Sequence, residues 1–343
     1  MKILLMTITL SLAAMNCLAQ TSKLKYPKTV KGNTVDEYFG VKVSDPYRWL
    51  ENDTSAATAQ WVKTENKLTN DYLGRIPFRS NLLKRLTEVA NYEKIRAPFK
   101  KNGKYYYYKN DGLQNQSVIY VQDALDGESR VFLDPNTLSS DGTVALTGLS
   151  FSRNGKYAAY TISRSGSDWQ EIYVIDLSSN KLLNDHILWA KFTGASWHGD
   201  GFYYSAYDAP VKGKEFSNVN EGHKIYYHKI GTPQSEDKLI YQNAEHPKRF
   251  YGVDLNKEET VMFLTESGEG SGNNLYIKDL TKPDSEFQPM TSDMNHLYAP
   301  IEAIGSKIYL STNYKAPKGC IMVADINQPD IKNWQMLVPE TQN

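Results

Sequence analysis

A pattern of turns and strands recurs in this sequence at intervals of roughly 40 to 50 residues and limits the folds that it can adopt. Each copy has a turn rich in Gly, Asn and Asp, a strand of Tyr, Phe and small residues, a second turn, and a further strand that often ends on an acid. The strand pairs of the copies begin at Lys104 and Ile119, Tyr157 and Ile172, Gly201 and Ile225, Val261 and Leu275, and Ser306 and Ile321. Such a period is typical of four-stranded β-propeller blades. We therefore predict an all-β propeller of about five blades and not an α/β enzyme core.

The net charge of the chain does not favour a highly charged binding partner, and the composition narrows its function little further. The chain of 343 residues carries 39 basic and 39 acidic residues, so its formal net charge is +0. Nothing in this balance favours a nucleic-acid or an acidic-membrane partner. Tyr is frequent, with 24 copies, and runs such as Tyr105–Tyr108 look like strands. We expect these rings to pack within sheets rather than to form a carbohydrate-stacking platform.

The first nineteen residues have the pattern of a secretory leader. Lys2 precedes an apolar run from Ile3 to Met15, and Ala19 precedes Gln20. The run is shorter than the roughly 20 apolar residues that cross a bilayer. We therefore predict a signal peptide, residues 1–19, and a secreted, most simply periplasmic, protein.

The two cysteines bear on lipidation and on disulfides. Cys17 raises lipoprotein attachment as an alternative, although the preceding Ala14, Met15 and Asn16 fit such a site poorly. After cleavage of the leader only Cys320 would remain, so the mature chain would hold no disulfide. Cys320 lies in a predicted strand, where we expect a small core residue.

Residues 20–92 differ from the repeats and predict a helical extension before the incomplete propeller, residues 93–343. Thr54 and Ser55 can cap a first amphipathic helix, and Pro77 is expected to open a second. The remaining sequence offers no helix to cover their apolar faces. They could lie on the flank of the propeller or belong with a domain outside this chain. Two long polar interruptions, Lys212–Gly222 and Glu266–Asn274, are predicted to be exposed loops.

No catalytic or metal motif stands out within these residues. A Gly-x-Ser-x-Gly nucleophile elbow is absent, and Gly268–Gly272 has the wrong spacing and precedes a strand. The six histidines show no zinc pattern, so we expect surface histidines or histidines satisfied within strands. Asp254, Asn256 and Glu258 imitate a calcium loop but lack its glycine, because Glu259 stands in its place. We predict no metal and no cofactor.

Four short blocks are more particular than generic propeller sequence. They are Asp45–Glu51, Gly112–Val118, Asp134–Asn136 with Asp141–Thr143, and Ser165–Trp169. With them the chain resembles the amino-terminal half of the prolyl oligopeptidase family, from Tyr26 to near its end.

The resemblance implies a seven-bladed propeller and an α/β-hydrolase domain that carries a Ser, Asp and His triad. Two blades and that domain, with every catalytic residue, would then follow Asn343, and this chain would be inactive alone. The helices would pack on the hydrolase domain. The propeller would cap the active site and admit only short peptides, which are cut after proline by the triad scheme. The complete protein would be a monomer.

Two tentative substrate-binding residues follow from the same resemblance. Phe192 matches a family aromatic that protrudes toward the substrate, although core packing is an equal alternative. Phe250 falls where the family would place a methionine that lines the same cavity. Expected partners are short proline-containing peptides, with no nucleic acid and no membrane. A different interpretation remains open, namely a complete five-bladed propeller that binds peptides or proteins.

Overall fold

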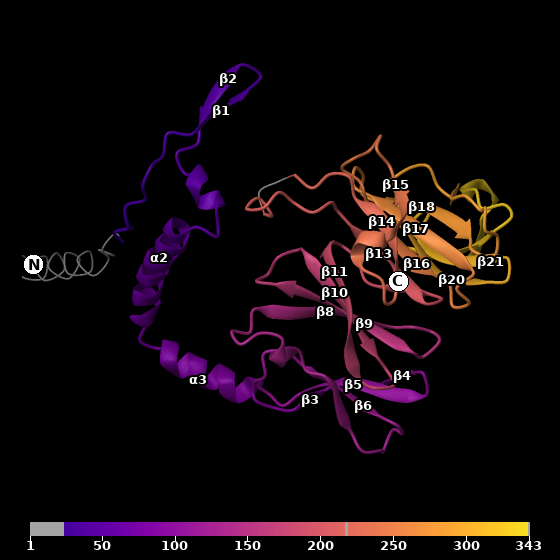
Figure 1. Ribbon diagram of the computed structural model, residues 1–343, viewed down its shortest axis with the longest axis horizontal. Helices are drawn as coiled ribbons and strands as arrows, with labels where there is room; N and C mark the ends of the chain where they lie inside the picture. The colour runs from indigo at the N-terminus through magenta and orange to yellow at the C-terminus, as the bar shows by residue number, and fades with distance from the viewer. Residues whose placement is uncertain (1–23, 217–218, 342–343) are drawn as a thin grey trace, which may run out of the picture. The chain divides into compact units, whose positions relative to one another are not determined.

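The computed structural model describes residues 24–216 and 219–341 (Figure 1). The predicted leader and Cys17 lie outside the described residues. The chain divides into two compact units, with the boundary between Leu86 and Thr87. No helix of the described residues is long and apolar enough to cross a membrane.

The first unit contains a hairpin, a short 3-10 helix and a long α-helix. Its elements are β1 (Val35–Tyr38), β2 (Val41–Ser44), η1 (Arg48–Glu51) and α2 (Ala56–Gly74). Arg48 pairs with Asp36 on β1 and with Asp45 at 2.7 Å, so the block Asp45–Glu51 is fixed to the hairpin by ion pairs. The Trp61 indole donates to Thr29 Oγ1 at 3.0 Å and attaches α2 to the preceding segment.

The helix starts are partly as predicted. Ser55 is the N-cap of α2, and its hydroxyl accepts a hydrogen bond from the Thr58 amide, which confirms the predicted start. The prediction for the second helix is wrong by two residues, because α3 spans Arg79–Ala90. The Arg79 amide donates to the Ile76 carbonyl, so Pro77 lies in a turn that precedes the helix.

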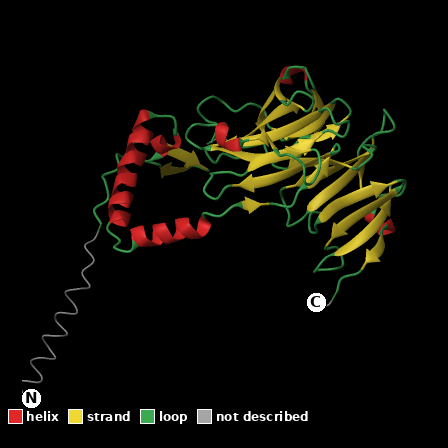
Figure 2. Ribbon diagram, turned by 90° about the horizontal axis from the view of Figure 1, so that it is seen from below, coloured by secondary structure: helices red, strands yellow, loops and turns green. Residues whose placement is uncertain are grey.

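The second unit consists of antiparallel strands (Figure 2). They form sheets of five, eight, four and four strands. We divide the eight-stranded sheet where β11 meets β13 and so name five blades, 1 to 5. Blade 1 has β4 (Phe99–Lys101), β5 (Lys104–Asn110), β6 (Val118–Gln122) and β7 (Arg130–Leu133), with β3 (Lys94–Ile95) also on β5. Blade 2 has β8 (Val144–Phe151), β9 (Tyr157–Arg164), β10 (Gln170–Asp176) and β11 (Lys181–Ala190). Blade 3 has β12 (Ser196–His198), β13 (Gly201–Ala206), β14 (Lys224–Lys229) and β15 (Lys238–Gln242).

Blades 4 and 5 repeat the same arrangement. Blade 4 has β16 (Phe250–Leu255), β17 (Val261–Ser267), β18 (Asn273–Asp279) and β19 (Gln288–Pro289). Blade 5 has β20 (Tyr298–Ile304), β21 (Lys307–Thr312), β22 (Cys320–Asp325) and β23 (Gln335–Val338). Short 3-10 helices occur at η2 (Pro135–Thr137), η3 (Gln234–Glu236) and η4 (Ile331–Asn333). Every predicted strand pair is the central hairpin of one blade, which confirms the all-β propeller prediction.

The core lies between successive blades. The strand pairing between blades 2 and 3 is limited to one position, Ala190 of β11 with Ala206 of β13, and most of their contact is through side chains. Strand β13 shows how: Phe202 and Tyr204 join the cluster with blade 2, whereas the alternate residue Tyr203 joins the cluster with blade 4. Because side chains alternate across a strand, blade 3 buries both of its faces.

The prediction that Glu266–Asn274 is an exposed loop is wrong. Strands β17 and β18 extend into this segment, and only residues 268–272 connect them. The Glu266 side chain is fully buried, and its Oε2 accepts hydrogen bonds from Asn274 and Tyr276 and lies 3.3 Å from Arg249 Nη1. A buried charge is tolerated when it is paired in this way. The described part of Lys212–Gly222 is a largely exposed loop, as predicted, and Cys320 is buried.

Two of the singled-out blocks connect blade 1 to blade 2. Gln116 donates from Nε2 to the Val144 carbonyl at 2.7 Å and accepts from the Leu146 amide at 2.8 Å, so it caps the start of β8. Asn136 donates to the Gln116 carbonyl at 2.9 Å, and Asp134 accepts from the Asn136 amide. The blocks Gly112–Val118 and Asp134–Asn136 therefore form one hydrogen-bonded unit.

A buried histidine joins blades 2 and 3. His228 on β14 lies between Asp237, 2.7 Å from Nδ1, and Asp185 of β11, 3.1 Å from Nε2. Tyr204 donates to the second oxygen of Asp237. Burial disfavours the charged imidazolium, but the hydrogen bonds and charges of Asp237 and Asp185 prevail and raise the pKa of His228. The protonated ring thus balances charge between two buried carboxylates.

We expect His228→Gln to lower the free energy of unfolding by about 3 kcal/mol near pH 6, because it leaves two buried carboxylates without a cation. A raised folded-state pKa contributes stability below the unfolded value of 6.5, and this contribution is lost as pH rises through the folded value. The difference from wild type in urea unfolding should therefore shrink toward alkaline pH. His246→Gln, at a ring that is 39% exposed, is the control. A difference that grows with pH contradicts this assignment.

Candidate functional site

The two phenylalanines singled out from the sequence lie side by side. Phe192 follows β11, and Phe250 is the first residue of β16. Their ring centroids are 5.4 Å apart with an interplanar angle of 46°. Phe192 is 53% exposed and Phe250 is 36% exposed, so neither ring is a core residue. The structure thus makes them one aromatic surface, which we call the aromatic pair.

Phe192 is held by the residue before it. Lys191 is only 7% exposed, and its ammonium lies 4.8 Å from the centroid of Trp169 and 5.5 Å from that of Phe192. Asp168 is 3.8 Å away. Cation–π contacts in such partly desolvated surroundings contribute about 1 to 2 kcal/mol. The block Ser165–Trp169 therefore supplies both the ring and the carboxylate that fix Lys191.

The backbone of Phe192 is itself constrained. Its φ of 54° lies in the left-handed region, which non-glycine residues rarely adopt. Thr193 Oγ1 accepts from the Ser205 amide at 2.9 Å, and the Ser205 hydroxyl donates to the Tyr251 carbonyl at 2.8 Å. The unusual conformation is thus maintained by hydrogen bonds on the residues that flank the aromatic pair.

A buried histidine completes this support. His223 Nδ1 accepts from the Tyr251 amide at 2.9 Å, and its Nε2 lies 3.1 Å from the Lys191 carbonyl. A backbone amide can only donate, so the proton is on Nε2 and the ring is neutral. Burial lowers the pKa of His223 to about 4. His223 therefore ties the neighbour of Phe192 to the neighbour of Phe250.

Sequence reasoning did not find this role for His223. It treated the histidines as surface residues or as satisfied strand residues, and His223 immediately precedes β14. Its partners come from two other segments, the end of β11 and the start of β16. No spacing in the sequence indicates that these three segments meet.

A cavity of about 520 Å³ adjoins the aromatic pair. Its walls come from β8, β9, the segment from Phe192 to Ser196, and β16. The lining residues are Thr147, Gly148, Leu149, Ser150, Ala159, Thr161, Phe192, Thr193, Gly194, Ala195, Ser196, Gly252, Val253 and Asp254. Most of this surface is apolar or carries hydroxyl groups, which suits an uncharged peptide backbone. Asp254 contributes the one charged side chain.

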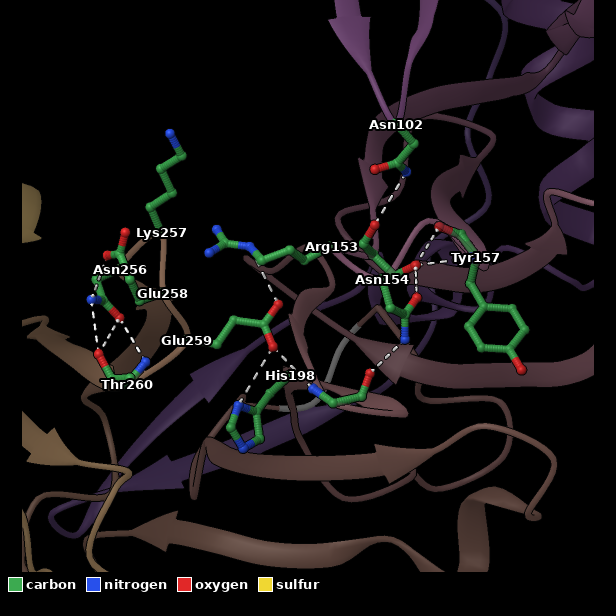
Figure 3. Close-up of polar contacts among 12 residues, drawn as sticks. Asn102, Arg153, Asn154, Tyr157, His198, Asn256, Lys257, Glu258, Glu259 and Thr260 are labelled. Atoms are coloured by element: carbon green, nitrogen blue, oxygen red, sulfur yellow. Dashed lines mark hydrogen bonds and ion pairs between the residues drawn. The ribbon is translucent and has the colours of Figure 1, made fainter.

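Turns between the first two strands of neighbouring blades are joined by polar contacts, as Figure 3 shows. Asn102 of blade 1 donates to the Ser152 carbonyl at 3.3 Å, and Asn154 of blade 2 donates to the Gly199 carbonyl at 3.1 Å. The Gly199 amide donates in turn to Glu259 of blade 4 at 3.1 Å. We call this set of contacts the turn network.

Glu259 is the central acceptor of the turn network (Figure 3). Arg153 lies 3.6 Å and His198 lies 3.9 Å from its carboxylate. Asn256 extends the network by donating to the Ala303 carbonyl of blade 5 at 3.2 Å. The turn network thus connects all five blades.

The described residues offer no evident catalytic centre. Within residues 24–216 and 219–341, no group of three or more His, Cys, Asp or Glu side chains is placed to hold a metal ion. Asp254 and Glu258, which imitate a calcium loop in sequence, belong to no such group. The residues 268–272 connect two strands of a hairpin and do not open a helix. The aromatic pair and the cavity beside it have a shape and chemistry suited to binding a ligand.

These features define the class as a β-propeller with an exposed aromatic pair beside a cavity. Residues 27–343 match the family described as "Prolyl oligopeptidase, N-terminal beta-propeller domain". The chain belongs to this family.

Relatives at the sequence level carry prolyl endopeptidase names. The chain is 44% identical over 323 residues to a prolyl endopeptidase of Elizabethkingia miricola, covering 94% of this chain and 45% of that protein. It is 33% identical to prolyl oligopeptidase A of Amanita bisporigera, covering 92% of this chain and 46% of the relative. The chain thus spans about half the length of the curated relatives it matches.

Solved structures give the same result. Prolyl oligopeptidase B of Galerina marginata, bound to a 25mer macrocyclization substrate, matches with a TM-score of 0.79 and 29% identity. The match covers 93% of this chain and 48% of that one. The fold is therefore that of the amino-terminal propeller portion of a prolyl endopeptidase.

The lowered pKa of His223 predicts a specific pH dependence. Between its folded value of about 4 and the ordinary 6.5, the unfolded chain binds a proton that the folded chain does not. The free energy of unfolding should therefore fall by up to about 3 kcal/mol as pH drops through this range.

The glutamine variant isolates this effect. In His223→Gln the amide can accept from Tyr251 and donate to Lys191 without titrating. Urea unfolding at several pH values should show a flatter profile for this variant than for wild type. His246→Gln should keep the wild-type slope. Parallel profiles for wild type and His223→Gln would refute the neutral, clamping role of His223.

Proposed function

We propose that this chain is the helical extension and propeller part of a secreted prolyl endopeptidase, and that the aromatic pair contacts short proline-containing peptides. The observation that carries the proposal is the juxtaposition of Phe192 and Phe250 beside a cavity, in a chain of this family. Two half-exposed rings that are held in place by buried neighbours form a preorganised apolar surface, and preorganisation reduces the entropic cost of binding.

The cavity supports a peptide as the ligand. Its lining of small, aliphatic and hydroxyl side chains can receive an extended backbone, while the rings face apolar groups such as the pyrrolidine of proline. The walls come from three blades, so a ligand must fit between them. On this basis the propeller restricts the active site to short peptides.

Bond cleavage is assigned to the part of the relatives that this chain does not span. There a serine would attack the carbonyl carbon, a histidine would transfer the proton to the leaving amine, and backbone donors would hold the oxyanion. The present residues would position the peptide. Residues 1–19 would direct the protein to the periplasm and then be removed.

We expect Phe192→Ala to weaken binding of a short Gly-Pro peptide about 5- to 20-fold, because loss of a buried aromatic contact costs about 1 to 2 kcal/mol. Phe250→Ala should have a similar effect. Isothermal titration calorimetry on the purified chain provides the measurement. Phe39→Ala, at a fully exposed ring of the first unit, is the matched control. Equal affinities for wild type and Phe192→Ala would remove the aromatic pair from the binding site.

The chain by itself should neither hydrolyse a chromogenic Gly-Pro peptide nor react with a fluorophosphonate, because residues 1–343 contain no nucleophile elbow. Absorbance assays and in-gel fluorescence measure the two activities. A contaminating hydrolase is identified by whether activity follows the chain through chromatography. Turnover or labelling that copurifies with the chain would contradict the assignment of catalysis to another segment.

A further inference from the structure

Strand β16 connects the aromatic pair to a carboxylate. Its alternate residues Phe250, Gly252 and Asp254 share one face, because side chains alternate along a strand. Gly252 and Asp254 both line the cavity beside Phe192. Asp254 also lines a second cavity of about 730 Å³. It therefore stands between the aromatic pair and the turn network.

The surroundings of Asp254 are unusual for a carboxylate. Its side chain is exposed to solvent, and the protein that surrounds it partly removes its hydration and raises its pKa. Among the described residues none donates a hydrogen bond to it or forms an ion pair with it; burial is the one influence on its titration. This exposed carboxylate therefore has no charge partner within the described residues.

No neighbouring charged side chain forms an ion pair with the Asp254 carboxylate among the described residues. The first cavity has no other charged lining residue. The second cavity is also lined by Lys101, Arg153, Lys257 and Glu259, and of these Arg153 is engaged with Glu259 in the turn network. A single carboxylate does not make a calcium or magnesium site, since those ions require about six or more oxygen ligands. An organic cation that brings its own hydrogen-bond donors is the better complement.

We propose that Asp254 is the cation-binding subsite of the peptide site, and that it pairs with an ammonium or guanidinium group of a peptide whose proline lies on the aromatic pair. The inference rests on the proposed function and specifies its substrate class. Asp254 is four positions after Phe250 on the strand, a rise of roughly 14 Å at about 3.4 Å per residue. An extended peptide has the same rise, so the positive charge belongs about four residues from the proline.

Three peptides distinguish the possible sources of the cation. The first is acetylated and carries lysine four residues before a proline amide. The second has norleucine in place of the lysine, which keeps the length and removes the charge. The third has norleucine and a free amino terminus. Binding of each to wild type, Asp254→Asn and the control Asp126→Asn is measured by calorimetry at pH 7; Asp126 lies in the exposed turn between β6 and β7.

We expect wild type and Asp126→Asn to bind the lysine peptide about 3- to 10-fold more tightly than the acetylated norleucine peptide. Asp254→Asn should abolish this preference without weakening binding of the acetylated norleucine peptide. If the norleucine peptide with a free amino terminus also binds more tightly than the acetylated norleucine peptide, the subsite accepts any ammonium group. If only the lysine peptide binds more tightly, the subsite accepts a side-chain cation.

Failure of the inference and failure of the proposed function give different results. Equal binding of all three peptides to wild type, with Phe192→Ala still weakening each, overturns the Asp254 subsite and leaves the aromatic pair in place. A preference for lysine that persists in Asp254→Asn also overturns it. No binding of any peptide to wild type removes the proposed function and this inference together.

Discussion

Face-to-face packing of successive blades is the constraint on which the rest of this structure depends. Each hydrophobic cluster draws its side chains from two neighbouring blades, so no blade completes a core alone. Blade 4 illustrates the principle, because Met262 and Leu264 pack toward blade 3 whereas Val261 and Phe263 pack toward blade 5. This packing brings distant segments together, and Phe192 meets Phe250 for that reason.

Polar contacts between blades fix how neighbouring blades align with one another. His228 between two aspartates, Gln116 at the start of β8 and Glu259 in the turn network each join different blades. Such contacts contribute modestly to stability when both partners are present but are costly to leave half-made, so they favour one alignment of the blades. His223 is a further contact of this kind, because it bonds to Lys191 and Tyr251, the neighbours of Phe192 and Phe250.

Much of the fold could be predicted from the sequence, because turn residues and period-2 strands recur at blade spacing. One error concerns the start of α3, and the other occurs where polar residues are buried. Glu266 and Asn274 were predicted to be loop residues, but Glu266 is buried against Asn274 and against Arg249, which precedes β16. The aromatic pair came from family resemblance and not from pattern. The contacts of His223 were not recognised, because its partners Lys191 and Tyr251 are distant from it in sequence.

The central claim is that the aromatic pair holds the proline of a bound peptide. Intermolecular nuclear Overhauser effects between the pyrrolidine protons of a Gly-Pro peptide and assigned aromatic protons of the chain test it most directly. The account predicts contacts to the rings of both Phe192 and Phe250, which lie 5.4 Å apart. Contacts confined to other aromatic residues, or none at a peptide concentration that saturates binding, would contradict it.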